Sequence, residues 1–245
     1  MSLPVAILAG GLATRLHRLT ERIAKALVEV AGRPFVVHQL ELLRRNGLTD
    51  IVLCLGHLGD QVRETLGDGA RWGVRVRYSS DGQALLGTGG ALRRALPPLG
   101  DAFFVLYGDS YLDCDYAAVE RAFRTSGMPG LMTVYRNDDR WDRSNVLHFD
   151  GRTVRYDKHE RTPDMRHIDY GLGAFQARVL GRCPAGKPLD LSAVYRDLVA
   201  EGQLAAREVT DRFYEIGSPE GLAETRRRLA STCQPAHEDL GGGER

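Results

Sequence analysis

The stretch that decides the fold is V-A-I-L-A-G-G, at residues 5–11. Residues 5–9 form an apolar run long enough for one buried strand, and Gly10 and Gly11 end it with a glycine turn. A buried strand followed by such a turn is typical of the first strand of a parallel sheet. The backbone N–H groups of the turn can form an anion-binding nest, although many strand-to-helix connections need glycine for backbone reasons alone.

Outward from this stretch, the first half of the chain alternates between strands and helices. Strands are expected at residues 51–55, 74–78, 103–107 and 131–135, and helices at residues 34–46, at 61–66, after Thr88 and at 117–124. Strands that alternate with helices imply a parallel sheet covered on both faces. The predicted fold is therefore α/β, a single Rossmann-like three-layer α/β/α domain with a mainly parallel central sheet.

The second half has a different pattern. Polar residues 136–143 predict a long surface loop, and residues 145–158 predict a hairpin that turns at Asp150-Gly151. The other expected elements are a strand at 169–175, a helix at 191–200, a strand pair at 208–216 and a helix at 219–229. We expect a smaller, antiparallel part that forms the second wall of a cleft. The expected domain spans residues 1–232, divided near residue 135, and residues 233–245 are expected to be a flexible tail.

Composition narrows the class of protein. The 245 residues are 43% hydrophobic and 27% charged, which is close to the globular average, and the formal net charge of +1 provides no global field for nucleic acid or an anionic membrane. The four cysteines contain no C-x-x-C pair, so neither a zinc site nor a redox dithiol is indicated. With no basic leader and no apolar run of about 18 residues, we expect a cytoplasmic protein, monomeric or homodimeric, that acts on small molecules.

Three segments at predicted carboxyl ends of strands carry the candidate chemistry, because open α/β sheets place their ligands at that edge. The glycine turn is followed by Arg15, which can grip phosphate bidentately, and Lys25 comes ten residues later. Asp109 follows the strand at 103–107; it offers a hard oxygen ligand to Mg²⁺, or it is a helix cap or turn residue. Residues 86–91, L-G-T-G-G-A, let a flat ring or phosphate approach the backbone, or simply form a tight turn.

Lysine is rare in this chain. Only Lys25, Lys158 and Lys187 are lysines among 33 basic residues, so a lysine indicates a local need for a compact point charge. Lys187 lies in a stretch rich in glycine and proline and is expected to be a solvated loop residue. Lys25 and Lys158 are therefore the two lysines for which a local reason is expected.

In order along the chain, these segments resemble the sugar-phosphate nucleotidylyltransferases, a family with a GT-A-like fold. Residues 11–20 and 24–27 match the family signature G-x-G-T-R-L-x-P-L-T followed by P-K-x-L, residues 86–91 match L-G-T-[AG]-G-A, and residues 213–219 match W-x-D-[IV]-G-[ST]-P. The chain departs from the signature at Ala13, which replaces a glycine, at Arg18 and Ala24, which replace prolines, and at Glu215, which replaces an aspartate.

The resemblance implies roles for particular residues. Arg15, Lys25 and Asp109 would be catalytic; Leu8, Gly10, Gly11, Thr14, Gln83, Gly87 and Thr88 would bind the nucleotide; Asn145, Lys158, Asp169, Tyr170 and Gly171 would bind the sugar phosphate. The implied cofactor is Mg²⁺, held by Asp109 and by Glu215, although the extra methylene of Glu215 also allows contact with a sugar hydroxyl.

The resemblance also implies an activity, the joining of a nucleoside triphosphate and a sugar 1-phosphate to give a nucleotide sugar and pyrophosphate. Within the family, the chain looks most like the guanylyltransferases of D-glycero-D-manno-heptose 1-phosphate. Use of UTP or dTTP, and a non-catalytic nucleotide-sugar-binding subunit, stay open as alternatives. An NAD-dependent oxidoreductase is disfavoured, because the G-x-G-x-x-G spacing and the acidic ribose residue are both missing.

Overall fold

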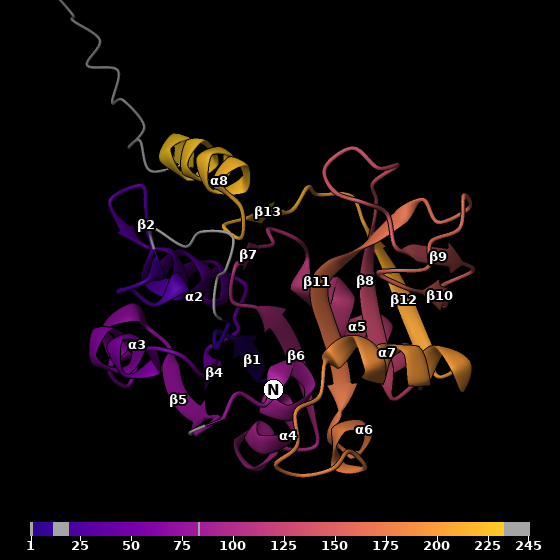
Figure 1. The fold of residues 1–245 in the computed structure, drawn as a ribbon, viewed down its shortest axis with the longest axis horizontal. Coiled ribbons are helices and arrows are strands. Elements are labelled where there is room, and N and C mark those ends of the chain that lie inside the picture. The colour runs from indigo at the N-terminus through magenta and orange to yellow at the C-terminus, as the bar shows by residue number, and fades with distance from the viewer. Residues whose placement is uncertain (1, 12–19, 83, 233–245) are drawn as a thin grey trace, which may run out of the picture.

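The computed structural model describes residues 2–11, 20–82 and 84–232, and the predicted tail lies outside them. A nine-stranded mixed sheet runs through the molecule (Figure 1). Its order is β5 (Arg75–Ser80), β4 (Asp50–Leu55), β1 (Val5–Leu8), β6 (Ala102–Tyr107), β11 (His167–Gln176), β8 (Gly130–Arg136), β12 (Leu204–Val209), β10 (Arg152–Tyr156) and β9 (Val146–Phe149).

The first four strands of that order are parallel and end together. Leu8, the last residue of β1, pairs with Cys54 on β4 and with Tyr107 on β6. Every strand predicted in the first half is present, with ends that agree within two residues. The carboxyl ends of β5, β4, β1 and β6 therefore form one continuous edge, which is where an open α/β sheet binds its ligands.

The other five strands correct the prediction of a mainly parallel sheet with a smaller antiparallel part. β11 runs antiparallel to β6 and β8, and the hairpin β9–β10 turns at Asp150 and Gly151 as expected, but all of these strands continue the same sheet. The predicted strand pair at 208–216 is wrong. β12 instead lies parallel to β8, while β13 (Tyr214–Glu215) pairs with β7 (Ser110–Tyr111). The apolar start of β12 consists largely of alanine, a weak strand signal that hid a strand with neighbours on both sides.

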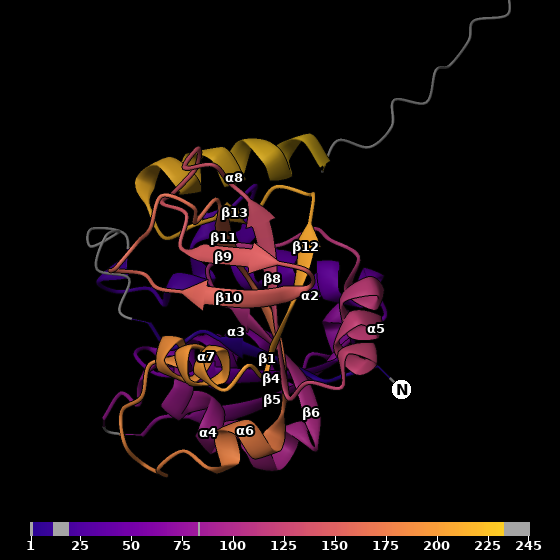
Figure 2. The same cartoon turned by 90° about the vertical axis from the view of Figure 1, so that its right-hand side faces the viewer.

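Helices pack on both faces of the sheet (Figure 2). One face carries α2 (Phe35–Arg45), α3 (Gly59–Leu66) and α5 (Tyr116–Ser126); the other carries α4 (Gly87–Leu99), α6 (Ala177–Gly181) and α7 (Leu191–Ala200). Side chains of β1 alternate between the two cores, with Val5 and Ile7 in one and Ala6 in the other. This alternation explains why strands buried on both faces read as unbroken apolar runs in the sequence.

The last helix, α8 (Pro219–Thr232), packs on a third, smaller core. It covers the short ribbon β2 (Glu29–Val30) and β3 (Arg33–Pro34), with Val30, Phe35 and Ile216 buried beneath it. Two 3-10 turns, η2 (Lys25–Leu27) and η3 (Ala70–Trp72), complete the described elements. None of the helices within the described ranges is both long and apolar enough to cross a membrane.

Candidate active site

A cavity of about 330 Å³ opens at the carboxyl ends of the four parallel strands. Each of these strands contributes to its wall within one position of its carboxyl end: Asp81 after β5, Cys54 on β4, Leu8 on β1 and Tyr107 on β6. The remaining lining residues are Ala9, Gly10, Gly11, Lys25, Ala26, Leu85, Gly87, Thr88, Ala91, Gly108 and Asp109. Five residues proposed from the sequence as nucleotide-binding, Leu8, Gly10, Gly11, Gly87 and Thr88, thus lie in one wall.

In the sequence, the glycines of the turn could serve either ligand binding or the backbone alone, and the structure gives a different answer for Gly10 and Gly11. A Cβ on Gly10 would lie 2.9 Å from the backbone nitrogen of Gly56, so the protein's own packing requires this glycine. A Cβ on Gly11 would meet no atom of the described chain within 4 Å, and its φ is not positive. Since Gly11 lines the cavity and nothing in the described part of the chain requires glycine there, the missing side chain leaves room for a ligand.

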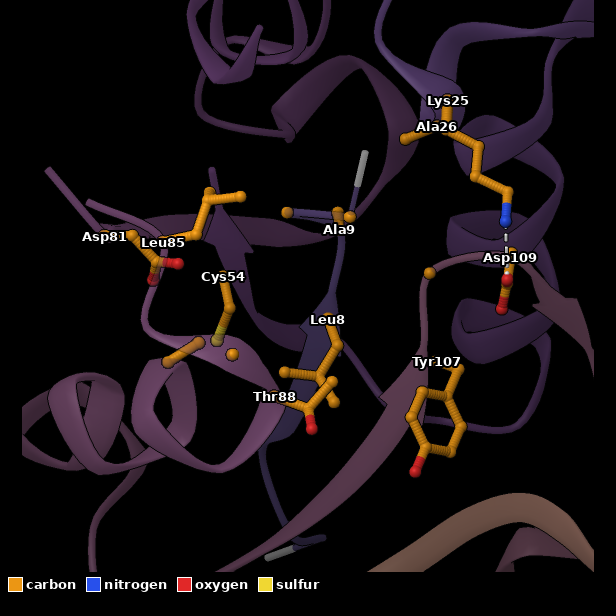
Figure 3. A pocket seen from close by; sticks show the side chains of 15 residues that line it. Leu8, Ala9, Lys25, Ala26, Cys54, Asp81, Leu85, Thr88, Tyr107 and Asp109 are labelled. Carbon is orange, nitrogen blue, oxygen red and sulfur yellow. Dashed lines mark hydrogen bonds and ion pairs between the residues drawn. The ribbon is translucent and has the colours of Figure 1, made fainter. Parts of the chain in front are cut away.

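Lys25 and Asp109 meet at one end of the cavity (Figure 3). Lys25 Nζ lies 2.6 Å from Asp109 Oδ2, and the lysine side chain is only 16% exposed. Ser110 Oγ approaches the other oxygen, Asp109 Oδ1, at 3.3 Å. An ammonium and a carboxylate that are 84 positions apart in the chain are thus placed together, as a site for phosphate and a divalent cation requires.

Lys25 is positioned by an element that the sequence did not reveal. Ala24, where the family has proline, has φ −55°, a value within the range of proline. Its backbone N–H, which proline would lack, donates to Gln61 Oε1 at 2.9 Å, and Gln61 Nε2 donates to the carbonyl of Arg22. A side-chain brace from α3 therefore holds the backbone that a proline ring stiffens in the family signature.

The backbone on either side of Asp109 is held in place by Gln39 and by the close packing of Gly108. Gln39 of α2, 1% exposed, donates from Nε2 to the carbonyl oxygens of Tyr107 at 3.1 Å and of Ser110 at 2.8 Å, on either side of the aspartate. A Cβ on Gly108 would lie 2.6 Å from the carbonyl of Leu8, so this glycine lets the turn lie against β1. In the sequence, Gln39 reads as an ordinary polar residue of an amphipathic helix, so no local pattern indicated this support.

Gly87 and Thr88 form the start of α4 and are tied to a distant segment. Gly89 N and Gly90 N donate to the carbonyl of Leu189, and Thr88 Oγ1 accepts from the backbone of Leu191 at 2.8 Å. Gly87 has φ +69°, and a Cβ there would lie 2.7 Å from Leu189 O. The glycines of this turn are therefore required by packing, and they also bring backbone to the cavity wall.

Glu215 lies beside Asp109, but its carboxylate serves the start of α8. Oε2 accepts from the backbone N–H groups of Gly217 and Ser218, and Oε1 accepts from Ser218 Oγ at 2.5 Å. A Cβ on Gly217 would be 2.7 Å from Glu215 Oε2 and 3.3 Å from Asp109 Oδ2, so both carboxylates border one small volume.

The residues around this volume provide some, but not all, of the ligands that the implied divalent metal ion needs. Mg²⁺ is commonly bound through one or two carboxylates together with water and substrate phosphates, and Asp109 offers such a ligand. The described residues contain no cluster of three or more histidine, cysteine or acidic side chains suited to a metal ion. The two carboxylates therefore fit a cation site that water and substrate phosphates would complete.

The sugar-phosphate candidates come from the antiparallel half. Asn145 Oδ1 accepts from the backbone N–H of Asp169 at 3.0 Å, which fastens the β9–β10 hairpin to β11. Lys158, just beyond β10, holds its Nζ 6.0 Å from the ring centre of Tyr107, a residue of the cavity wall. Gly171 needs its glycine, because its φ is +98°. The side chain of Tyr170 is 2% exposed and packs in the core, so only its backbone is available to a ligand.

Two carboxyl groups near Lys158 have shifted pKa values. Burial raises the pKa of Asp169, an effect opposed by Lys158, by the N–H of Gly171 and by the Tyr156 hydroxyl. For Asp190, burial acts in the same direction, but hydrogen bonds from Ser192 together with Lys158 and Arg196 outweigh it and lower the pKa. Lys158 thus lies in an acidic neighbourhood and holds a local positive charge there.

Asp81 and Cys54 are cavity residues that we did not identify from the sequence. Asp81 stands before a glycine and reads as a turn residue, yet it is 8% exposed at the end of β5. Burial raises the pKa of the Cys54 thiol to about 12, so this cysteine is an apolar wall residue and not a nucleophile. Arg15, Thr14 and Gln83, which the resemblance also selected, lie outside the described residues.

Comparison with known proteins agrees with this geometry. The model of the nucleotidyl transferase family matches residues 5–145. The N-acetylmuramate alpha-1-phosphate uridylyltransferase of Neisseria meningitidis serogroup B is 30% identical, over 86% of this chain and 92% of that protein. A mannose-1-phosphate guanyltransferase beta-B of Xenopus laevis is 28% identical over 87% of this chain, which spans only 61% of that protein.

Solved structures give the same fold. A putative glucose-1-phosphate thymidylyltransferase from Bacillus anthracis superposes with a TM-score of 0.81 at 22% identity, covering 99% of this chain and 98% of that chain. HddC from Yersinia pseudotuberculosis gives a TM-score of 0.76 at 24% identity, covering 93% of this chain and 100% of that chain. The chain belongs to the nucleotidyl transferase family and is an enzyme of the sugar 1-phosphate nucleotidyltransferase type.

Proposed function

We propose that the protein joins GTP and a manno-heptose-type sugar 1-phosphate to give a GDP-sugar and pyrophosphate. The observation that carries the proposal is the Lys25–Asp109 pair, 2.6 Å apart, at one end of a cavity whose walls include the glycine turns around Gly11 and Gly87. The choice of guanine and heptose rests on the sequence resemblance. The choice of guanine, though not that of heptose, is also supported by HddC from Yersinia pseudotuberculosis, which has been solved with GMP-PN.

The reaction needs little acid–base chemistry from the protein. An oxygen of the sugar phosphate attacks the α-phosphorus of the triphosphate in line, a new P–O bond forms, and the bond to the β-phosphate oxygen breaks to release pyrophosphate. A phosphate monoester is already a competent nucleophile, so the protein must align two anions and stabilise charge on the leaving group. Positive side chains held in a fixed position are therefore the main requirement.

Different residues bind the triphosphate, the sugar phosphate and the nucleoside. Lys25, fixed beside Asp109, contacts the reacting phosphates, and the backbone of Gly10 and Gly11 lies against the triphosphate. Lys158 approaches the same cavity across Tyr107 and anchors the phosphate of the sugar. From the sequence resemblance, Arg15 binds the β- and γ-phosphates. The walls at Leu8, Gly87 and Thr88 take the nucleoside.

Enzymes of this family in general use a divalent metal ion. In this chain we assign Asp109 and Glu215 to hold Mg²⁺, which when bound neutralises charge on the triphosphate and the leaving pyrophosphate. Asp109 also orients Lys25 through their ion pair.

A substrate matrix tests the proposal. The purified protein is incubated with GTP, UTP, dTTP, CTP or ATP and with manno-heptose, mannose, glucose or N-acetylglucosamine 1-phosphate, and pyrophosphate release is measured with Mg²⁺ and with excess EDTA. We expect Mg²⁺-dependent release that is fastest with GTP and manno-heptose 1-phosphate. Release with UTP or dTTP in preference to GTP would reassign the nucleotide. Nucleotide-sugar binding without any release would favour the non-catalytic alternative.

A further inference from the structure

Asp81 stands at one end of the cavity, and the Lys25–Asp109 pair stands at the other (Figure 3). Around Asp81 the wall consists of Leu85, Cys54 and Leu8, which are apolar and suit the face of a flat ring. The triphosphate belongs at the end with the lysine. A nucleotide in this cavity therefore points its base toward Asp81.

The carboxylate of Asp81 is fixed in place. Its backbone N–H donates to the carbonyl of Leu55 at 2.9 Å, its carbonyl accepts from Arg94 Nη1 at 3.2 Å, and its Oδ2 accepts from Leu86 N at 2.9 Å. Among the residues that the structure describes, no donor contacts Oδ1. The Asp81 side chain, 8% exposed, is thus held in one orientation at the cavity wall, with one carboxylate oxygen able to accept from a ligand.

An ionised carboxylate accepts hydrogen bonds and donates none. On its Watson–Crick edge guanine offers two adjacent donors, N1–H and the exocyclic N2–H₂. Uracil and thymine offer one N–H between two carbonyl oxygens, and adenine and cytosine place an acceptor beside their amino group. Guanine is therefore the one common base that satisfies both oxygens of a carboxylate at once.

We propose that Asp81 reads the Watson–Crick edge of guanine and sets the preference of this enzyme for GTP. The inference rests on the proposed nucleotidyltransferase function and deepens it, because it assigns the base contact to one side chain. Burial raises the pKa of Asp81, and the Leu86 N–H and the charge of Arg94 oppose this only in part, so the described residues leave the ionised carboxylate incompletely compensated. Two N–H donors from a base would supply that compensation.

Inosine triphosphate supplies the sharpest test, since its base is guanine without the exocyclic amino group. Dissociation constants for GTP, ITP and UTP are measured by titration calorimetry with Mg²⁺ and without sugar phosphate, for wild type, for Asp81→Asn and for Asp101→Asn. Asp101 is an exposed aspartate at the opposite edge of the sheet and is the matched control. In Asp81→Asn, the amide oxygen can still accept from Leu86 N, so the turn before α4 is preserved.

We expect wild type and the control to bind GTP roughly 10- to 100-fold more tightly than ITP, the range for a hydrogen bond to a charged group. In Asp81→Asn the GTP-to-ITP ratio should fall below about threefold, and UTP should bind more tightly than in wild type. Equal wild-type affinities for GTP and ITP, or a uniform loss for all three nucleotides in the variant, would overturn the inference.

The wild-type GTP-to-ITP ratio decides the question even if Asp81→Asn does not fold, and thermal unfolding of each variant identifies that case. Failure of the proposed function has a separate signature, because then no nucleotide binds and no pyrophosphate appears with any sugar 1-phosphate. Binding of several nucleotides without discrimination, together with pyrophosphate release, leaves the nucleotidyltransferase activity standing but removes both the preference for GTP and the role of Asp81.

Discussion

In the half of the sheet made by β5, β4, β1 and β6, each strand delivers a residue within one position of its carboxyl end to the cavity wall. In the half made by β11, β8, β12, β10 and β9, the candidate sugar-phosphate residues lie on strands and loops that other segments must hold in place. Asn145, just before β9, accepts a hydrogen bond from β11 and so ties the hairpin to it. Lys158 lies two residues after the end of β10.

This difference predicts which step of the reaction a substitution in each half of the sheet affects. Parallel strands bring their carboxyl ends together through the topology itself, so the nucleotide wall follows from the order of the elements. The sugar side depends on pairings between distant segments, such as β12 inserted between β8 and β10. We expect variants of the first half to affect chemistry and nucleotide binding, and variants of the second half to act mainly through the sugar phosphate.

The largest expected effect belongs to the nucleotide half. Lys25→Ala removes the ammonium that lies 2.6 Å from Asp109 and should lower kcat/KM on the order of 10²-fold or more, because one transition-state charge contact is lost. Steady-state kinetics with GTP and the best sugar phosphate measure this. Lys187→Ala, in an exposed loop, is the matched lysine control and should keep wild-type rates. A Lys25→Ala enzyme with an unchanged rate would contradict the role.

Lys158→Ala tests whether the two halves of the sheet bind different substrates. Its kcat/KM should also fall by roughly 10²-fold, but the loss should appear chiefly in the KM for the sugar phosphate, because Lys158 approaches the cavity from the antiparallel side across Tyr107. The dissociation constant for GTP alone should stay within about threefold of wild type. A comparable loss of GTP affinity would show that the two sides do not divide the substrates as proposed.

The sequence predicts the nucleotide half better than the sugar half, for a physical reason. The apolar runs of β1, β4 and β6 and the residues after them are local signals, and Asp109 could be picked out because it directly follows such a run. The pairing of β13 with β7, which brings Glu215 beside Asp109, joins residues about a hundred positions apart and leaves no local pattern. Only the family resemblance indicated that contact.

The two supporting glutamines could not be predicted from the sequence, for a different reason. Gln39 and Gln61 act by hydrogen bonding to backbone, and their value depends on the groups that they face in the fold. A glutamine on an amphipathic helix carries no mark of such a partner. Asp81, followed by glycine, has the composition of an ordinary turn, so its place in the cavity could be read only from the structure.

A smaller effect is expected from Gln61→Ala. The variant loses the hydrogen bond to Ala24 N, so the backbone before Lys25 should become less ordered, and kcat/KM should fall about 5- to 10-fold with little change in the KM for the sugar phosphate. Gln61→Glu keeps an acceptor at Oε1 and should retain more activity than Gln61→Ala. Equal rates for wild type and Gln61→Ala would show that η2 holds Lys25 without this brace.

The smallest effect concerns stability in the sugar half. Because burial raises the pKa of Asp169, the folded protein takes up this proton at a higher pH than the unfolded chain does, so the ionised carboxylate disfavours folding at neutral pH. Asp169→Asn should therefore stabilise the protein at neutral pH, by roughly 0.5–2 kcal/mol.

The advantage of Asp169→Asn should shrink as the pH falls through the raised pKa, and it should be gone below the unfolded value of about 3.9. Denaturant unfolding of wild type and variant across this pH range measures it. A constant difference at every pH would mean that the substitution acts through packing and not through the charge.

The contact between residues 187–191 and the start of α4 has a practical consequence for engineering. A Cβ on Gly87 would collide with the carbonyl of Leu189 and one on Gly90 with the carbonyl of Lys187, and a Cβ on Gly89 would lie 3.0 Å from Leu189 Cγ, closer than ordinary contact. Libraries intended to alter nucleotide choice should leave these three codons untouched. The cavity is also bordered by residues that carry side chains of their own, and diversity introduced there is where new base preferences should be sought: Leu85, Cys54 and Ala91.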